Sequence, residues 1–438
     1  MTDEDNNHPR PTPRTVSRRR LLGAAGVGGA AGIALGVGGY ALADAGGDPA
    51  ATTGGSGDGA ALAGLGADAV PFHGTHQAGI VEPMQSTLHA TAFDLTSGTG
   101  RPGLVSLMKR WSAAAAAMAE GRTPPGLTDD QVALDAGPSS LTVTFGFGAP
   151  VFTKAGLTAQ LPSQLTPLPP FPEDQLDRAR SDGDLWVQVC ADDPLVAYHA
   201  MRTLQRLAVG QAAPRWQTTG FSRAPGATRE PMTGRNLMGQ IDGTNNPKPG
   251  SAGFDATVFV PANATAATAA GQPSWMAGGS YAVFRRIRML LDTWDQQSLD
   301  VQQRTIGRRK DNGAPLSGGP GSSETTTVDL ESFDPDGSLA IPGDAHIRVA
   351  AAASNQGAAM LRRGYSYHDG YRPDGAPDAG LLFVAFQADP MTGFVPVQRK
   401  LARGDALSRF LVHESSGLYA VPGGASPDGY VGQALLES

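Results

Sequence analysis

The chain has 438 residues, of which 40% are hydrophobic, so it is long enough for one large domain or two ordinary ones. Its formal net charge is −7, and lysine and arginine cluster only in residues 1–20 and 304–310, which excludes a broad nucleic-acid-binding surface. The apolar content is well above that of a disordered protein. Cys190 is the only cysteine, which excludes an intramolecular disulfide, a CxxC zinc site and an iron–sulfur cluster.

The N-terminus has the pattern of an export signal. Polar residues lead into Ser17-Arg18-Arg19-Arg20-Leu21-Leu22, and an uncharged stretch follows as far as Ala43. Adjacent arginines before a modest apolar run resemble a twin-arginine signal peptide at 1–43, and Ala41-Leu42-Ala43 has the small-x-small form of a cleavage site. Eight glycines between residues 21 and 43 make this stretch a poor membrane span, although an uncleaved anchor is the alternative. Because this route carries folded proteins, often with a cofactor inserted, the signal is a first indication of a cofactor.

Residues 44–69 are rich in Gly, Ala, Asp, Thr and Ser and predict a flexible linker, so the fold is expected to begin near Val70. Beyond it, hydrophobic periodicity predicts an alternation of strands and helices. Strands are expected at His89–Leu95, Leu141–Phe147, Leu185–Ala191, Ser280–Arg286 and Leu381–Phe386. Helices are expected at Leu104–Glu120, Pro194–Val209, Met289–Trp294 and Asp405–Val412.

Two of the predicted strands end alike. The apolar strands that begin at Leu185 and Leu381 both run into Asp-Pro, at Asp193-Pro194 and Asp389-Pro390. This echo favours two duplicated α+β units with antiparallel sheets, and chance similarity of two core strands is the alternative. Cys190 lies in the first of these strands, so we interpret it as an inert core thiol rather than a reactive one.

The segment Gly234–Pro247 places an acidic residue among turn formers. Asp242 lies between apolar Ile241 and Gly243 and opens the string Asp-Gly-Thr-Asn-Asn-Pro. By residue type alone this string is an Asx-rich turn that Asp242 caps. The functional alternative is that Gly243 lets the backbone approach a flat ligand closely.

Two later segments carry a histidine and an arginine pair. His346 precedes an alanine-rich run, and such a lone histidine is ordinarily a core or surface residue, with metal ligation as the alternative. Arg362 and Arg363 stand beside an aromatic run, which is equally typical of a surface pair with buried stems. The remaining histidines after residue 8 have no metal-ligand spacing and are interpreted as structural: His73, His76, His89, His199, His368 and His413.

Taken together, the three segments resemble the dye-decolourising peroxidase family. Gly239-Gln-Ile-Asp242-Gly243 matches its GxxDG signature, His346 its proximal haem ligand and Arg362 its distal arginine. The string Leu361–Tyr367 is similar to that of the exported deferrochelatase/peroxidase branch, which is associated with iron uptake. Three further strings extend the resemblance over roughly residues 70–425: Phe72–Ile80, Gly307–Leu316 and Ser415–Gly423.

The resemblance implies an α+β fold of two ferredoxin-like halves, at 70–230 and 231–438, with antiparallel sheets arranged like a dimeric α+β barrel. Haem b is expected mainly in the C-terminal half, with the neutral imidazole of His346 on the iron. An acceptor should hold the other imidazole nitrogen; Asp344 is near in sequence, but the role is left unassigned. Asp242 is expected to take a proton from hydrogen peroxide and return it to the leaving oxygen, and Arg362 to stabilise the developing negative charge.

The resemblance also implies further contacts with the haem, in addition to that of Arg362. The residues expected to line the haem face or bind a propionate are Gly243, Thr244, Asn245 and Arg308. Relatives often carry polar residues shortly after the proximal histidine, whereas Ala350–Ala353 stand here. Candidates to replace them are Ser354, Asn355 and Gln356.

The predicted function is therefore a haem-dependent peroxidase that oxidises a donor with hydrogen peroxide. The alternative is a haem-binding iron-acquisition protein that releases iron from haem or oxidises ferrous iron. The expected partners are hydrogen peroxide, a reducing donor, the twin-arginine export machinery and iron-uptake proteins, and a homo-oligomer is compatible with the sequence. The expected location is extracellular, cell-wall-associated or periplasmic. Several aromatic residues are interpreted as core rather than as electron relays: Trp186, Trp275, Trp294, Tyr365 and Tyr367.

Overall fold

The computed structural model describes residues 66–225, 227 and 233–438. The predicted signal at 1–43, and the predicted linker as far as residue 65, lie outside the described residues. Gly66 and Asp68 accept main-chain hydrogen bonds from Ser139 and Ser140, both of 2.7 Å. The fold therefore includes residues that precede Val70. Within the described residues, no helix combines the length and the apolar character that a membrane crossing requires.

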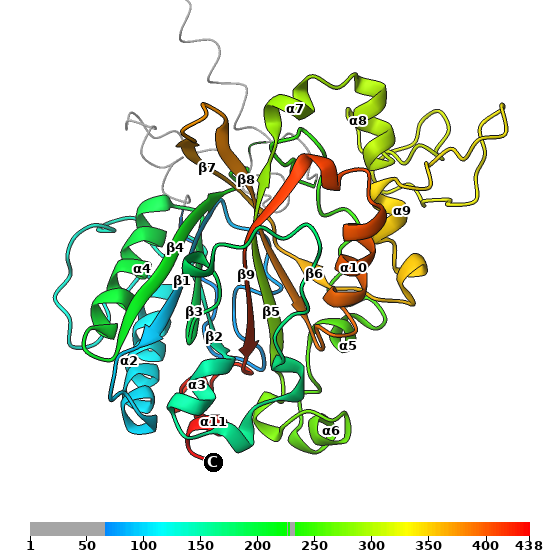
Figure 1. Cartoon of the computed structure of the whole chain (residues 1–438). Helices are drawn as coiled ribbons and strands as arrows, with labels where there is room; N and C mark the ends of the chain where they lie inside the picture. Colours follow the sequence, from blue (N-terminus) through cyan, green and yellow to red (C-terminus); the bar gives the residue numbers. More distant parts are fainter. Residues whose placement is uncertain (1–65, 226, 228–232) are drawn as a thin grey trace, which may run out of the picture. The chain divides into compact units, whose positions relative to one another are not determined.

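The N-terminal half is an antiparallel sheet with helices packed on one face (Figure 1). Its strands lie in the order β4-β1-β3-β2. The main elements are β1 (Thr87–Leu95), α2 (Arg101–Ala119), β2 (Thr142–Gly148), β3 (Leu185–Ala191), α4 (Pro194–Ala208) and β4 (Ala212–Phe221). Shorter helices are α3 (Ala149–Lys154), η1 (Thr158–Gln160), η2 (Ser163–Leu165) and η3 (Arg178–Arg180). Asp193 caps α4 by accepting bonds from the Leu195 and Val196 amides, of 2.7 and 3.2 Å.

The C-terminal half repeats this arrangement. Its strands lie in the order β9-β5-β8-β7, and β6 pairs with the same edge of β8 as β7 does. The strands are β5 (Ser280–Met289), β6 (Leu361–Arg362), β7 (Tyr365–Tyr371), β8 (Pro377–Gln387) and β9 (Leu411–Val421). The α-helices are α5 (Phe254–Val258), α6 (Ala264–Ala269), α7 (Leu291–Asp295), α8 (Leu299–Ile306), α9 (His346–Ala350), α10 (Phe394–Gly404) and α11 (Gln433–Leu436). The 3-10 helices are η4 (Ser274–Met276), η5 (Ala352–Asn355) and η6 (Ser408–Phe410).

Both halves have the same topology. Numbered in chain order within each half, with β6 left aside, the strands lie in the order 4-1-3-2, which is that of a ferredoxin-like unit. This shared topology accounts for the similar ends of the two predicted strands. β3 and β8 are the third strands of their halves, and each precedes a helix. The expected α+β fold of two ferredoxin-like halves is confirmed.

The two sheets join into one antiparallel barrel at two short seams. β2 meets β9 through the pairs Phe147–Ala420 and Gly148–Tyr419, and β4 meets β7 through Phe221–Ser366. A glycine faces a tyrosine at each seam. A Cβ on Gly146 would lie 2.9 Å from Cβ of Tyr419, and a Cβ on Gly220 would lie 2.7 Å from Cβ of Tyr365. Any side chain at these glycines would push the halves apart.

Alternate residues of the strands fill the barrel. Leu88, Ala90 and Ala92 of β1 point inward, and the intervening residues face the helices, as the two-residue period of a strand requires. The rings of Trp186 and Tyr419 stack inside the barrel with centroids 5.5 Å apart. All residues predicted to belong to the core are buried: Trp186, Cys190, Trp275, Trp294, Tyr365 and Tyr367. Burial also raises the pKa of the Cys190 thiol.

The predicted strand at Leu185–Ala191 has the observed bounds, and the other predicted strands and most helices agree within a few residues. The helix predicted at Asp405–Val412 is wrong. The helix of that region is α10, which ends at Gly404, and the chain then passes through η6 into β9. Leu411 and Val412 pair with β5, so their apolar side chains belong to a strand. β4 was not predicted, since Pro214 interrupts its pattern at a bulge against Phe93.

Candidate functional site

His346 is the first residue of the short helix α9. Its Nδ1 lies 2.7 Å from Oδ2 of Asp405, whose side chain is only 2% exposed. Asp405 follows α10 and is fixed by its second oxygen, which accepts the amide of Leu407 at 2.9 Å. The two segments are also linked by the main chain, because the Ala406 amide donates to the carbonyl of Asp344 at 2.9 Å. Asp405, 59 residues away, is thus the partner of the imidazole, and Asp344 supports it only through its backbone.

The charges around His346 work in opposite directions. Burial disfavours the imidazolium, but the charge and hydrogen bond of Asp405, with a contribution from Asp242, raise the pKa of His346 above its ordinary value of 6.5. The charge of Arg362 opposes this rise. Asp242 and Arg362 are therefore near enough to His346 to act on it electrostatically. The structure brings the three predicted residues into one region.

Asp242 and Arg362 form an ion pair across 120 residues of sequence. Nη1 of Arg362 lies 3.0 Å from Oδ1 of Asp242. The Asp242 main chain is held by its amide, which donates to the Gly234 carbonyl at 2.9 Å. Nδ2 of Asn236 lies 3.4 Å from the other carboxylate oxygen. The side chains of Asp242, Arg362 and His346 are 30%, 29% and 29% exposed, so all three border accessible space.

The turn after Asp242 depends on its glycine. Gly243 has φ = +118°, a backbone conformation that side chains with a Cβ rarely adopt, and its carbonyl accepts the Asn246 amide at 2.9 Å. The residues therefore form the turn that their types predict, and the turn places the Asp242 carboxylate beside Arg362. Asn246 also bonds the main chain of Arg362 in both directions, at 2.7 and 3.2 Å.

Glu324 connects the turn to Arg308. One of its carboxylate oxygens accepts the Thr244 hydroxyl at 2.6 Å, and the other accepts the Thr233 amide at 3.2 Å. Arg308 is only 7% exposed, and its Nη1 donates to the carbonyls of Gly313 and Glu324 at 2.7 and 3.0 Å. Burial lowers the pKa of Arg308, although the charge of Glu324 works against this. Arg308 therefore sits close to the predicted haem-facing turn, with one nitrogen already engaged.

The segment after His346 shows how the alanine run is accommodated. Ala350 ends α9, and Nδ2 of Asn355 donates to the carbonyls of Val349 and Ala351 at 2.8 Å each. The carbonyl of Ser354 accepts a bond from Lys400, and Gln356 adopts φ = +57°. The Asn355 amide is thus occupied in closing the end of α9.

The contacts that complete the site could not be predicted from the sequence. Asp405, Glu324 and Asn246 belong to no spacing pattern with the residues that they hold. Asn246 carried a weak signal, because it lies in the same turn-forming string as Asp242. Asp405 fell within a stretch assigned to the wrong helix.

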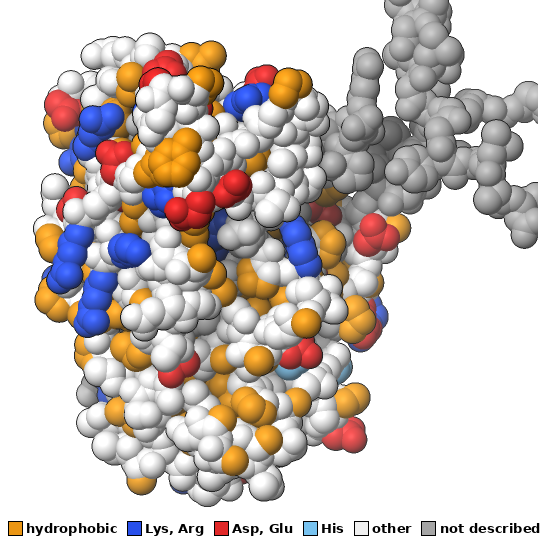
Figure 2. All heavy atoms as spheres, turned by 90° about the vertical axis from the view of Figure 1, so that its right-hand side faces the viewer, with side chains coloured by type: hydrophobic (Ala, Val, Ile, Leu, Met, Phe, Trp, Pro, Cys, Tyr) orange, Lys and Arg blue, Asp and Glu red, His pale blue; other side chains and the backbone are white. Residues whose placement is uncertain are grey.

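α8, α9 and α10 lie on one side of the fold, and Figure 2 shows this side in space-filling form. Basic side chains gather on the left of the view and hydrophobic side chains reach the surface beside them (Figure 2). The exposed basic residues of α10 and its following turn are Arg399, Lys400, Arg403 and Arg409. The face that carries α9 therefore offers both charged and apolar surface.

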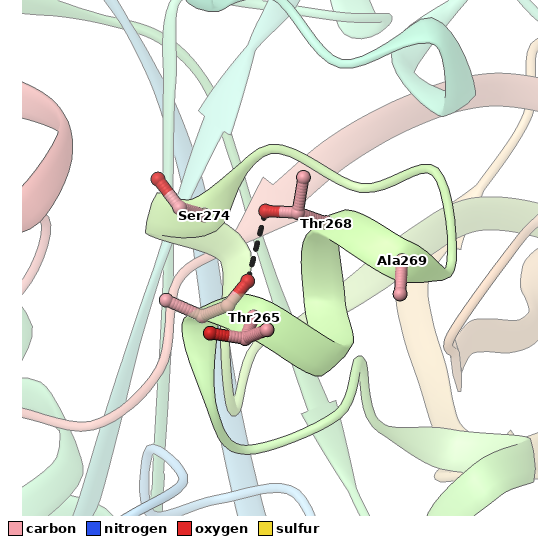
Figure 3. A pocket seen from close by; sticks show the side chains of 5 residues that line it. Thr265, Thr268, Ala269 and Ser274 are labelled. Carbon is pink, nitrogen blue, oxygen red and sulfur yellow. Dashed lines mark hydrogen bonds between the residues drawn. The ribbon is translucent and has the colours of Figure 1, made fainter.

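A separate hollow lies between α6 and η4 (Figure 3). It is lined by Ala264, Thr265, Thr268, Ala269 and Ser274. The Thr268 hydroxyl is engaged by the Ala264 carbonyl at 2.8 Å. The hollow holds no titratable side chain, so it offers no acid, base or iron ligand.

Comparison with known proteins defines the class of protein. Residues 77–222 match the family model described as Dyp-type peroxidase, N-terminal, and residues 233–426 match Dyp-type peroxidase, C-terminal. Together they span most of the described fold, and they identify a peroxidase. The chain belongs to the Dyp-type peroxidase family, a family of haem peroxidases, and uses hydrogen peroxide to oxidise a donor.

Individual relatives agree with this. A dye-decolorizing peroxidase of Thermobifida fusca is 42% identical over 372 residues, covering 82% of this chain and 84% of the relative. A deferrochelatase of Yersinia pseudotuberculosis is 36% identical over 381 residues, covering 84% and 85%. The crystal structure of a DyP-type peroxidase from Streptomyces coelicolor is 58% identical with a TM-score of 0.83, covering 86% of this chain and 99% of the other. Ferric DtpA from Streptomyces lividans gives the same values. The predictions of family and of peroxidase function are confirmed.

Proposed function

We propose that this chain is an exported dye-decolourising peroxidase that binds haem b through His346 and activates hydrogen peroxide with Asp242 and Arg362. The observation that carries the proposal is the meeting of three partly exposed polar side chains from segments far apart in sequence. His346 has one ring nitrogen fixed by Asp405, and Asp242 and Arg362 are paired with each other. All three interact electrostatically.

The donor set fits a haem. A porphyrin supplies four nitrogen ligands to its iron, so one neutral imidazole completes the protein's share of the coordination. With its proton on Nδ1, His346 would donate a hydrogen bond to Asp405, and Nε2 would be left to hold the iron, as part of a more basic imidazole. The turn at Gly243, Thr244 and Asn245 would line the haem face, and Arg308 would bind a propionate with the nitrogens that the Gly313 and Glu324 carbonyls do not engage.

Haem, when bound, supplies the electrons for O–O cleavage and recovers them from donors one at a time. Asp242 accepts a proton from one oxygen of hydrogen peroxide and returns it to the other, which then leaves as water. Such proton transfer is typically worth roughly 10²–10⁴ in rate. Arg362 keeps its positive charge throughout and stabilises the negative charge that develops as the bond breaks. The ion pair of 3.0 Å holds the Asp242 carboxylate and the Arg362 guanidinium next to each other.

Substitutions separate these roles. His346→Ala should abolish haem binding, seen as loss of the Soret band in protein expressed with haem supplied. Asp242→Asn should keep the Soret band while the rate of reaction with hydrogen peroxide falls. Failure of the unaltered protein to bind supplied haem would refute the haem proposal. Full peroxide reactivity in both Asp242→Asn and Arg362→Leu would refute the assigned roles.

A second candidate function is iron release from haem. It is favoured by the 36% identity with a protein named deferrochelatase. The two functions share the cofactor and differ in the fate of the porphyrin. Absorbance spectra and iron assays of haem-loaded protein would decide between them, since iron release leaves an intact metal-free porphyrin, whereas peroxidase turnover leaves the haem in place and consumes donor.

Export rests on the sequence Ser17-Arg18-Arg19-Arg20 and the apolar stretch that follows it. We expect the full chain to leave the cytoplasm by the twin-arginine route and to act outside the cell, at the cell wall or in the periplasm. Replacing all three arginines by lysine should retain the protein in the cytoplasm. Cell fractionation and a peroxidase assay of each fraction measure export. Export of that variant at the level of the unaltered protein would contradict this route.

A further inference from the structure

Arg362 lies on a very short strand, β6, which pairs with only one other strand among the described residues. β6 pairs with β8 through Leu361–Phe386 and Arg362–Ala385, and the Arg363 amide donates to the Val384 carbonyl at 2.8 Å. Successive residues of a strand direct their main-chain N–H and C=O groups to opposite edges. Arg363 therefore faces β8, and the main-chain groups of Arg362 face away from the sheet.

The side chain of Asn246 closes that open edge. Its Oδ1 accepts the Arg362 amide at 3.2 Å, and its Nδ2 donates to the Arg362 carbonyl at 2.7 Å. One side-chain amide thus supplies both hydrogen bonds that a residue of a neighbouring strand would supply. Main-chain groups at a partly buried position are costly to leave unpaired, so the contact fixes Arg362 at this place.

The turn at 242–246 therefore holds Arg362 in two ways. One contact is charged, between the Asp242 carboxylate and the Arg362 guanidinium at 3.0 Å. The other is neutral, between the Asn246 amide and the Arg362 main chain. The two anchors belong to one turn, because the main-chain N–H of Asn246 donates to the Gly243 carbonyl at 2.9 Å.

The two contacts respond differently to the proton that Asp242 carries during turnover. A protonated carboxyl group loses the charge that makes its bond to an arginine strong. An asparagine amide does not titrate in this range, so its bonds persist. We propose that Asn246 is a positioning residue, which keeps the main chain of Arg362 beside Asp242 while Asp242 holds the peroxide proton. The proposal rests on the proposed roles of Asp242 and Arg362.

The test uses the full-length, haem-loaded protein and stopped-flow measurement of its second-order rate constant with hydrogen peroxide. Asn246→Ala removes both bonds. Asn246→Asp keeps the size of the side chain and its acceptor oxygen but cannot donate to the Arg362 carbonyl. It replaces the alanine variant in the test if that variant fails to fold. Asn263→Ala is the matched control, because Asn263 also bonds a main-chain amide, that of Ala266, but does so at the N-terminus of α6.

Both Asn246 variants should lower the rate constant roughly 10- to 100-fold, the size of effect expected from a misplaced catalytic group, with Soret absorbance retained. The control should match the unaltered protein. Hydrogen exchange at the Arg362 amide should accelerate in Asn246→Ala, which tests the hydrogen bond without any activity.

A double variant separates this proposal from the proposed function. In an Arg362→Leu background, Asn246→Ala should cause no further loss, since Asn246 acts through Arg362. An equal further loss would overturn the proposal, as would an unchanged rate in Asn246→Ala and Asn246→Asp while Asp242→Asn and Arg362→Leu are slow. The last result would leave the proposed function standing. Full activity of Arg362→Leu would overturn the proposal for Asn246, and full activity of both Arg362→Leu and Asp242→Asn would overturn the proposed roles as well.

Discussion

His413 of β9 should weaken the fold in acid. The side chain is 7% exposed, and its Nδ1 has no hydrogen-bond partner among the described residues. Burial, with the nearby charge of Arg285, lowers the pKa of His413 to about 3 from an ordinary value of 6.5. Between these two pH values, His413 is therefore neutral in the folded protein and protonated in the unfolded chain. Stability that is fully present above the unfolded pKa is lost as the pH falls through the window between these two values.

The size of the loss follows from the two pKa values. At about pH 5 the unfolded chain gains about 2 kcal/mol from protonating this histidine, and the folded chain gains almost nothing. His413→Gln removes the titration. The difference in unfolding free energy between about pH 8 and pH 5 should therefore be about 2 kcal/mol smaller in the variant than in the unaltered protein. Urea unfolding followed by tryptophan fluorescence measures both differences.

The comparison uses a difference between two pH values, so a uniform loss of packing in the variant cancels. His368→Gln is the control, because His368 is exposed on β7 and its replacement should leave the pH difference unchanged. An unchanged pH difference in His413→Gln would show that His413 is protonated in the folded protein. The inference from burial would then be refuted.

Three further outcomes are expected. Asp405→Asn weakens the hydrogen-bond acceptor at Nδ1 of His346. Haem should therefore be retained, with a higher reduction potential and roughly 10- to 100-fold lower activity. An unchanged reduction potential in a redox titration would contradict the role of Asp405. Gly243→Ala should lower the unfolding free energy by on the order of 1–3 kcal/mol, because φ is +118° there, whereas Gly343→Ala, with open space around its added Cβ, should have little effect. Cys190 is fully buried with a raised thiol pKa, so a thiol reagent should label it only after unfolding; rapid labelling of the folded protein would exclude the core interpretation.

Strands buried on both faces were the elements best predicted. β3 has the predicted bounds because a run of apolar residues, interrupted only by Gln188, between polar ends allows few other structures. β4 and β9 were missed for a different reason. β4 has exposed residues and a bulge at Pro214, and β9 contains the polar string His413–Ser416, whose place is set by pairing with β5. Pairing of distant strands leaves little trace in the local pattern of either one.

The candidate site divides in the same way. The sequence supplied His346, Asp242 and Arg362 through their motifs, because each motif is a local string. The partners of these residues lie far away in the chain: 59 residues separate His346 from Asp405, and 116 separate Asn246 from Arg362. Such contacts are formed by the packing of α10 and of the Asp242 turn against the C-terminal sheet, which no local spacing encodes.

The sequence by itself determined the class of fold, the buried strands and the candidate residues of the site, since hydrophobic periodicity and motif spacing are properties of neighbouring residues. The tertiary structure alone decided which groups act on one another. It assigned Asp405 to His346, placed Glu324 between Thr244 and Arg308, and set Asn246 at the open edge of β6. All of these contacts lie within the C-terminal half, whose packing brings segments separated by tens of residues within hydrogen-bonding distance.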